Sequence, residues 1–297
     1  MAMGPTRANK VGLVTGVTAG IGRVTARELA RAGMDVIGIG RNPQKATAVE
    51  AELRRESQNE HITILVADLS SLGEVRRVAG DILERAPRLD VLINNAGGYF
   101  ARRRLSRDGI ELTLALNLLS PFLLTNLLLD PLCAAPEGRV INVSSDAHMR
   151  GRMDFDDLEC RRRYPQMGMG AYGKAKLGLV MFTYELARRL AGRRVTANVL
   201  HPGFVASEFA KNNGALFRFF MPLLRPFALS VEQGAETSIY LATSPEVAGV
   251  TGEYFVRKHA VQSAAASYNE SAARQLWEVC AWMTGLEPRV SSPAPVP

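Results

Sequence analysis

The stretch TGVTAGIG, residues 15–22, decides the fold of this chain. It follows an apolar run at 10–15, which is typical of a buried strand, and it leads into a helical pattern at 21–32. Glycines between a strand and a helix let the backbone turn tightly and approach a pyrophosphate, whose charge then lies at the helix N-terminus. Glycine also occurs in turns for purely conformational reasons, so the strand–turn–helix context is what favours a nucleotide site. The residues predicted to form it are Gly16, Thr18, Ala19, Gly20, Ile21 and Gly22.

Outward from this turn, runs rich in Val and Ile alternate with helix-length segments along most of the chain. This alternation predicts an α/β fold, with one doubly wound parallel sheet and helices on both faces, as in the Rossmann fold. The expected strands are 10–15, 34–40, 62–67, 91–94, 139–144, 195–200 and 252–256. The expected helices are 21–32, 43–57, 72–86, a long helix around Asn117, 171–190 and 270–284.

Size and composition fit a single globular domain. The chain has 297 residues, of which 47% are hydrophobic and 22% charged, and no linker rich in Pro, Gly or Ser divides it. We expect one domain over residues 8–286. The tail at 287–297 contains four prolines and little else, which predicts disorder there.

The formal net charge of +7 suits nucleic acid, anionic lipid or a phosphate-bearing ligand. The basic residues fall in short scattered clusters without interleaved aromatic residues, so we expect no nucleic-acid partner. Cys133, Cys160 and Cys280 lie far apart without metal-ligand spacing, which indicates neither a disulfide framework nor a metal site. The N-terminal residues do not form a signal peptide, and a reducing cytoplasm is the expected location.

The uncharged stretch from Leu112 to Leu129 is long enough for a transmembrane helix. It contains polar residues and a proline, however, and acids bracket it at Glu111 and Asp130. A helix buried on most sides within an α/β protein gives the same pattern. We therefore expect a buried helix.

Two further motifs follow the glycine turn. NNAG at residues 94–97 comes after the fourth strand, and Asp68-Leu69 comes after the third. With these motifs and the TGxxxGxG spacing of the turn, the chain resembles the short-chain dehydrogenase/reductase family from about residue 10 to residue 285. The resemblance implies that Asn95, Ala96 and Gly97 support the central sheet beside a bound nicotinamide dinucleotide. It also implies that Asp68 and Leu69 contact the adenine ring of that dinucleotide.

The end of the second strand predicts which dinucleotide is bound. A carboxylate there bonds the ribose hydroxyls and repels a 2′-phosphate, whereas an arginine attracts it. Here the strand ends in Gly40, and Arg41 follows immediately. A charge-assisted bond to the phosphate is worth about 1.5–3 kcal/mol, or roughly ten- to a hundredfold in affinity. Arg41 could also be an ordinary surface residue, but the missing acid favours NADP(H).

Tyr172 and Lys176 are four residues apart and so share one face of a helix. A phenol titrates near 10, and lowering its pKa by about three units needs roughly 4 kcal/mol. An ammonium in a partly dry site beside an oxidised nicotinamide is a plausible source. Such pairs are common on helix surfaces. The resemblance makes this one catalytic, with Tyr172 as proton donor and acceptor and Lys176 supporting it while bonding the cofactor ribose.

The resemblance implies two further catalytic residues. In the segment 142–145 (NVSS), Ser145 matches the serine that hydrogen-bonds the substrate oxygen, and Ser144 could simply satisfy backbone groups. Asn117 matches the asparagine that helps to hold a water in the proton relay. A polar side chain inside so apolar a helix is costly unless it is bonded, which is an independent reason to expect a role for Asn117.

Downstream, HPGFVAS at residues 201–207 resembles the family's segment that meets the nicotinamide carboxamide, although an ordinary strand-to-loop turn would look alike. Ser207 stands where threonine is usual and keeps the hydroxyl. The contacts implied are from Pro202, Gly203, Val205 and Ser207.

Between Ser145 and Tyr172 lie 26 residues, about twice the interval in compact family members. The subgroup resembling retinol dehydrogenases has a similar extended segment, often with Ala-His after the serines, as at Ala147-His148 here. We therefore expect His148 to be a structural member of this loop and not a catalytic residue.

The segment 216–227 (LFRFFMPLLRPF) contains four phenylalanines. The family has a mobile lid over the substrate here, which implies a bulky apolar carbonyl or alcohol, such as a retinoid, a steroid or a long-chain or aromatic compound. A subunit interface and a peripheral membrane contact, assisted by Arg218 and Arg225, are the alternatives.

The sequence and the resemblance therefore predict an NADP(H)-dependent carbonyl reductase or alcohol dehydrogenase. A non-catalytic NADP-binding sensor or scaffold on the same fold is the alternative, because a fold does not guarantee an activity. A nucleotide-sugar epimerase shares the Tyr–Lys pair but usually has a TGxxGxxG turn and a longer substrate domain. A homodimer through the two helices that carry Asn117 and Tyr172 stays open.

Overall fold

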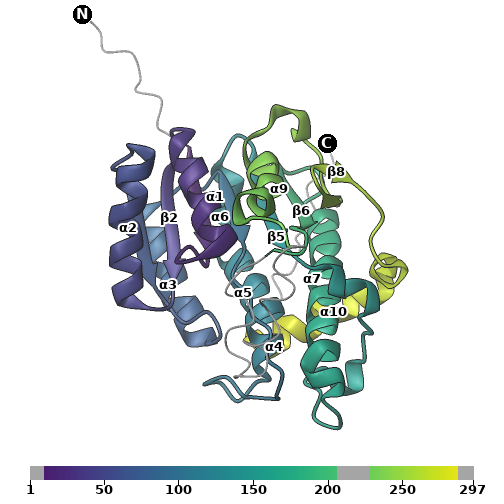
Figure 1. Cartoon of the computed structure of the whole chain (residues 1–297). Coiled ribbons are helices and arrows are strands. Elements are labelled where there is room, and N and C mark those ends of the chain that lie inside the picture. The colour runs from purple at the N-terminus through teal and green to yellow at the C-terminus, as the bar shows by residue number, and fades with distance from the viewer. Residues whose placement is uncertain (1–9, 206–227, 287–297) are drawn as a thin grey trace, which may run out of the picture.

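The computed structural model describes residues 10–205 and 228–286. Its strands form one sheet in the order β3-β2-β1-β4-β5-β6-β7-β8, and all neighbours are parallel except β7 and β8. The doubly wound α/β fold expected from the sequence is confirmed (Figure 1). The strands are β1 (Val11–Thr15), β2 (Asp35–Gly40), β3 (Ile62–Val66), β4 (Val91–Asn94), β5 (Gly138–Val143), β6 (Val195–His201), β7 (Tyr254–Val256) and β8 (His259–Ala260).

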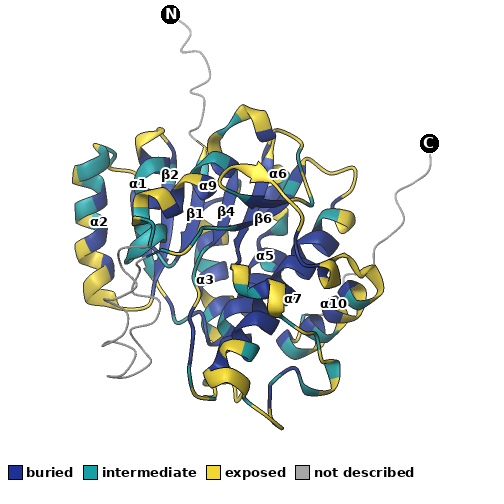
Figure 2. Cartoon of the chain, turned by 45° about the vertical axis from the view of Figure 1, so that its right-hand side comes forward, coloured by how far each residue is buried: buried dark blue, intermediate teal, exposed yellow. Residues whose placement is uncertain are grey.

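Each face of the sheet has its own hydrophobic core. Consecutive strand residues point to opposite faces, so Leu13 and Val14 are both fully buried but belong to different cores. This two-sided burial explains why the strands read as continuous apolar runs, and in Figure 2 the strands are mostly dark blue. One face is covered by α1 (Gly20–Arg31), α2 (Pro43–Ser57) and α9 (Val231–Thr243), and the other by α3 (Leu72–Arg85), α5 (Ser120–Leu127), α7 (Met169–Arg189) and α10 (Glu270–Thr284).

The sequence did not lead us to expect α9. Its N-terminus carries a recognisable signal, because the Ser230 hydroxyl accepts from the backbone N–H of Gln233 at 3.1 Å and the Gln233 side chain accepts from the backbone N–H of Ser230 at 3.0 Å. This is the reciprocal capping box that a Ser-x-x-Gln pattern encodes. The short β8 was also not expected.

The long helix expected around Asn117 is not one continuous α-helix. It consists of α4 (Leu112–Leu114), a π-helical segment (Ala115–Leu119) and α5, and a separate helix, α6 (Leu129–Ala134), follows. Pro121 has no N–H, so the carbonyl of Asn117 lacks the donor that an α-helix would supply four residues later. Segments of π-helix occur frequently at functional sites. In the part of the chain that the structure describes, no helix has the length and apolar character needed to cross a membrane.

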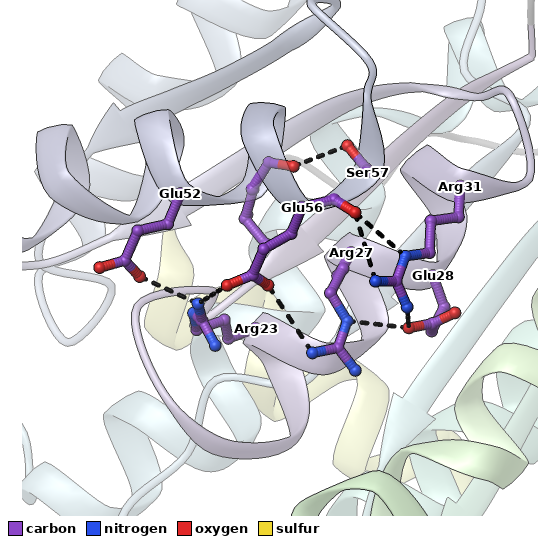
Figure 3. A network of polar contacts seen from close by, with 8 residues as sticks. Arg23, Arg27, Glu28, Arg31, Glu52, Glu56 and Ser57 are labelled. Atoms are coloured by element: carbon purple, nitrogen blue, oxygen red, sulfur yellow. Dashed lines mark hydrogen bonds and ion pairs between the residues drawn. The ribbon is translucent and has the colours of Figure 1, made fainter.

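An ion-pair network joins α1 to α2 (Figure 3). One terminal nitrogen of Arg23 lies 2.9 Å from Glu52 Oε2 and 2.8 Å from Glu56 Oε1. Arg27 Nη1 lies 3.7 Å from the other oxygen of Glu56. All of these side chains are partly exposed, so water and salt screen their charges.

Replacing Arg23 by alanine is expected to lower the free energy of unfolding by no more than about 1 kcal/mol, since exposed ion pairs contribute little. Urea unfolding would measure the loss, which should shrink further in high salt because the charges are screened. A loss well above this size that salt leaves unchanged would mean that the network stabilises the α1–α2 contact far more than its exposure indicates.

Candidate active site

The predicted site residues that the structure describes gather at the carboxyl edge of the sheet. Because neighbouring strands are parallel, β1, β4, β5 and β6 all end at this edge. The strand order reverses between β1 and β4, and in open α/β sheets ligands bind outside the carboxyl ends of the strands at such a switch point. The glycine turn follows β1 and the NNAG motif follows β4, so the two motifs flank this point.

The glycine turn has a backbone conformation and close contacts that require glycine. Gly16 has a φ of +75°, a left-handed conformation that favours glycine. A β-carbon at Gly22 would overlap both the carbonyl oxygen of Gly16 and the side-chain amide of Asn95. The turn can therefore take this shape only with glycine at residue 22.

Helix α1 presents an open N-terminus to this turn. Its N-cap residue, Ala19, is extended and has no side chain that could accept a hydrogen bond, and the first turn of the helix contains no acid. The first N–H groups of a helix need partners from outside it, and they carry a partial positive charge. This end of α1 therefore suits a phosphate, and the residues present fit a dinucleotide.

Thr15 joins the two motifs across the switch point. Its hydroxyl accepts from the backbone N–H groups of Asn95 at 2.9 Å and Ala96 at 2.8 Å. The Asn95 side-chain amide donates in return to the Thr15 carbonyl at 2.8 Å. The sequence identified both motifs, but it gave Thr15 no role because the contact needs β1 and β4 to be neighbours.

The end of the second strand is where the sequence predicts the preference for NADP(H). A β-carbon at Gly40 would overlap the Thr18 methyl group, so the strand end has no room for an acidic side chain unless Thr18 moves. Arg41 is exposed, and its guanidinium makes no hydrogen bond or ion pair with any residue of the described ranges. At the end of β3, one Asp68 carboxylate oxygen accepts from the backbone N–H and the hydroxyl of Ser70, and Leu69 is buried.

The structure brings Tyr172 and Ser145 together. Tyr172 is buried in the first turn of α7, and its hydroxyl shares a hydrogen bond with the side chain of Ser145, which directly follows Ser144 at the end of β5. The Ser145 hydroxyl also accepts from the backbone N–H of Ala147 at 3.2 Å. Ser144 does satisfy a backbone group, since its hydroxyl donates to the Lys176 carbonyl at 3.1 Å.

Lys176 and Asn117 meet at Gly97. A β-carbon at Gly97 would lie 2.8 Å from Asn117 Oδ1 and 3.5 Å from Lys176 Nζ, so both side chains reach the same point. Lys176 Nζ lies 5.7 Å from the centre of the Tyr172 ring and donates to the Val143 carbonyl at 2.8 Å. The four predicted catalytic side chains therefore form one continuous group.

Asn117 is fully buried and fully bonded. Its amide nitrogen donates to the carbonyls of Gly98 and Thr113, both at 2.9 Å, and its oxygen accepts from the Gly98 N–H at 3.2 Å. These bonds hold the π-helical segment against the loop after β4. They also give the buried Asn117 amide the hydrogen-bond partners that the apolar side chains around it cannot provide.

Burial dominates the electrostatics of the Tyr–Lys pair. It raises the pKa of Tyr172 above its usual value, and the bond to Ser145 opposes this. Burial also lowers the pKa of Lys176 to about 7, which weakens its positive charge at neutral pH. The depressed Tyr172 pKa expected from the sequence is therefore not produced by these residues alone. At neutral pH Tyr172 carries its proton.

A buried polar network beneath the site was not recognised in the sequence. The Asn94 side-chain amide donates to Asn142 Oδ1 at 2.8 Å and to the Thr125 hydroxyl at 2.9 Å, and the Asn142 amide donates to the Thr183 hydroxyl at 2.9 Å. The network ties β4 and β5 to α5 and α7, the helices next to Asn117 and Tyr172. Asn94 and Asn142 stand inside the quoted motifs, so the signal was present.

Tyr99 is a further residue that the sequence gave no reason to select. Its ring meets the Tyr172 ring edge to face, with 6.0 Å between the centres. Its hydroxyl donates to the Met167 carbonyl at 2.5 Å, and burial raises its pKa. Tyr99 thus connects the segment inserted before α7 to the catalytic tyrosine candidate.

The segment after β6 continues along the same edge. Gly203 has a φ of +86°, and Val205 forms a parallel bridge with Leu229. The nicotinamide contacts predicted for Pro202, Gly203 and Val205 stay predictions. Ser207 and the segment 216–227 lie outside the described residues, so their predicted roles stay predictions.

Comparison with known proteins agrees with this geometry. The sequence model described as short chain dehydrogenase matches residues 10–156 and 160–215. Retinol dehydrogenase 13 from Homo sapiens is 40% identical over 294 residues, which cover 97% of this chain and 88% of that protein. An uncharacterised protein from Mycobacterium paratuberculosis has a solved structure that is 31% identical, with a TM-score of 0.75 and 95% of each chain covered.

A structure of actinorhodin polyketide ketoreductase with NADPH is 26% identical to this chain, with a TM-score of 0.64, and the match covers 84% of this chain and 96% of that one. The family match extends over well more than half of the chain, and a relative with 40% identity extends over nearly all of it. The chain therefore belongs to the short-chain dehydrogenase/reductase family.

Proposed function

We propose that this protein is an NADP(H)-dependent reductase of bulky apolar carbonyl compounds, which also oxidises the corresponding alcohols. The observation that carries the proposal is the convergence of Tyr172, Ser145, Lys176 and Asn117 beside the glycine turn, at one edge of the sheet. General acid–base chemistry needs such groups within hydrogen-bond reach of one another.

The side chains supply the proton and orient the substrate. The bound cofactor would supply or accept the hydride. A carbonyl oxygen placed beside Tyr172 and Ser145 would accept a hydrogen bond from each hydroxyl, and Tyr172 would then transfer its proton to that oxygen. Lys176, with a pKa near 7, can return a proton to the tyrosine at neutral pH. The raised pKa of Tyr172 keeps on the phenol the proton that the reduction needs.

Exposed apolar side chains near the site favour an apolar substrate. Met167, whose carbonyl binds Tyr99, is 68% exposed, and Met169 lies one helical turn before Tyr172. Phe204 follows β6 at the same edge and is also exposed. A relative is named as a retinol dehydrogenase, and the sequence of the segment 216–227 is apolar. These features support a retinoid-like or long-chain carbonyl as substrate.

The exposed Arg41 supports NADP(H) over NAD(H), and a related ketoreductase was solved with NADPH. Replacing Arg41 by alanine is expected to weaken NADPH binding by roughly ten- to a hundredfold, because a charge-assisted bond to the 2′-phosphate is lost. NADH binding should change by less than about twofold, since NADH has no such phosphate. Titration of nicotinamide fluorescence would measure both dissociation constants.

Arg55→Ala is the matched control, because it removes the same charge from the far end of α2. It should leave both dissociation constants unchanged. Equal weakening of NADPH and NADH binding in Arg41→Ala would contradict a phosphate contact by Arg41.

Turnover tests the proposed function directly. The purified protein would be mixed with NADPH and with all-trans-retinal, decanal or 4-nitrobenzaldehyde, while the loss of nicotinamide absorbance is followed. Oxidation of NADPH with at least one carbonyl compound is expected. Tight NADPH binding without turnover of any of them would favour a non-catalytic sensor.

A further inference from the structure

The peptide group that follows Ser145 is held by two histidines. Its carbonyl, on Ser145, lies 2.7 Å from His148 Nδ1. Its N–H, on Asp146, donates to His201 Nδ1 at 3.2 Å. His148 lies three residues after Ser145 in the same loop, whereas His201 ends β6 and lies 55 residues after Asp146. One peptide unit therefore has an imidazole on each side.

The contacts of the two rings fix their protonation. His148 Nε2 accepts from the backbone N–H of Ala264 at 3.1 Å, so the ring proton sits on Nδ1 and is donated to the Ser145 carbonyl. His201 Nδ1 accepts, so its proton sits on Nε2. A second proton on either ring would place a donor against the N–H of Ala264 or Asp146. Both bonds therefore require neutral imidazoles.

The surroundings keep both rings neutral. His148 is fully buried and packs on the Tyr254 ring of β7 at 4.7 Å between centres, and burial lowers the pKa of both histidines. The nearby His148 ring lowers the pKa of His201 further. The Asp146 carboxylate opposes burial at both rings. Tyr184 of α7 lies beyond Tyr254 and is itself protonated, since burial raises its pKa.

We propose that His148 and His201 are positioning residues that clamp the Ser145–Asp146 peptide and thereby aim the Ser145 hydroxyl at Tyr172. The inference rests on the proposed function, because it assigns to the clamp the alignment of a catalytic serine. A displacement of about 1 Å at a catalytic group can cost roughly a hundredfold in rate. Neither histidine touches the reacting atoms.

The clamp makes activity and stability depend on pH. An unperturbed histidine titrates at 6.5, and the pKa of both rings is lower than this in the folded chain. The unfolded chain therefore binds more protons than the folded chain just below pH 6.5, and stability falls as the pH falls through this range. The stability contributed by the neutral histidines is complete only well above pH 6.5, where both the folded and the unfolded chain carry neutral histidines. The same protonation should release the Ser145 loop.

His201 carries the test, because it is only partly buried and can be replaced without opening the core. His201→Asn places an amide oxygen near the position of Nδ1, so the bond from Asp146 is kept without a titrating group. His201→Leu removes the acceptor. We expect kcat in His201→Leu to fall about tenfold at pH 8, as for one lost hydrogen bond. His201→Asn should keep kcat at pH 8 and lose part of the wild-type decline between pH 7 and 5.5.

The measurements are kcat and KM against pH, with NADPH and the fastest carbonyl compound of the three named above. The KM for NADPH should stay within about twofold of the wild-type value in both variants. A larger change would mean that the substitution also damages the cofactor site. Tyr172→Phe is measured alongside. Suppose that Tyr172→Phe is inactive while both His201 variants keep the wild-type rates and pH profiles. This result would overturn the proposed role of the two histidines and would still support the proposed function.

A second measurement needs no substrate. The free energy of unfolding, from urea titrations at pH 8 and 5.5, should fall less in His201→Asn than in the wild type. If Tyr172→Phe is fully active, the proposed function fails. The comparison of unfolding free energies at the two pH values still shows whether protonation of His201 destabilises the folded chain. An equal fall in the wild type and His201→Asn would overturn the inference.

Discussion

Replacing Tyr172 by phenylalanine is expected to lower kcat by about a thousandfold, within the range that general acid–base catalysis contributes. The ring would remain buried at the edge of Tyr99, so the shape of the site should be kept. Only the hydroxyl that bonds Ser145 and carries the proton is lost. Steady-state oxidation of NADPH by the carbonyl compounds would measure kcat, and nicotinamide fluorescence would show that NADPH still binds.

Tyr99→Phe is the matched control for this change. It also removes one buried phenol hydroxyl from the site, but that hydroxyl donates to the Met167 carbonyl. We expect kcat to fall by less than about tenfold, as for one lost hydrogen bond. If Tyr172→Phe turns over at the wild-type rate, the mechanism proposed here is wrong.

Replacing Gly22 by alanine is expected to have the second large effect. The added methyl group would overlap the Gly16 carbonyl and the Asn95 amide, so the glycine turn must move away from the loop after β4. Overpacking of this kind typically costs about 1–3 kcal/mol. Because the same turn forms the predicted phosphate site, NADPH binding should weaken by more than about tenfold, which is 1.4 kcal/mol.

Gly80→Ala is the comparison that makes this result specific. Gly80 also lies inside a helix, α3, but a β-carbon there would meet nothing within 4 Å. Alanine forms helix better than glycine by about 0.8–1.0 kcal/mol, so this variant should be more stable than the wild type. Urea unfolding and NADPH titration of both variants would give the contrast. Similar results for the two would mean that the turn at Gly22 is looser than its contacts indicate.

Much of the fold follows from local sequence. The alternation of apolar runs with helix-length segments predicted the bounds of α2 and α10 to the residue, and most other strands and helices to within one or two residues. The pair Tyr172 and Lys176 was also accessible, because residues four apart on a helix always share a face. The glycine turn could be recognised because it stands between a strand and a helix, and NNAG because it resembles the family's motif.

Local pattern failed where a single residue changes the hydrogen bonding of its neighbours. The sequence at 112–129 is apolar enough for one helix, yet Pro121 removes the donor for Asn117, and a π-helical segment forms instead. The proline was visible in the sequence. A proline can end, kink or locally widen a helix. Which of these happens depends on which nearby groups can donate a hydrogen bond to the carbonyl that has lost its donor, and those groups come from the rest of the fold.

The sequence by itself therefore determined the order of most elements, the motifs and, through the resemblance, the family's catalytic residue types. Only the tertiary structure decided that Thr15 bonds Asn95, that Tyr99 meets Tyr172, and that His201 reaches the peptide after Ser145. It also decided the charge states, because burial sets the pKa of Tyr172 and Lys176. The physical reason is common to all of these: contacts and dielectric surroundings depend on segments that are far apart in the chain and become neighbours only when the sheet assembles.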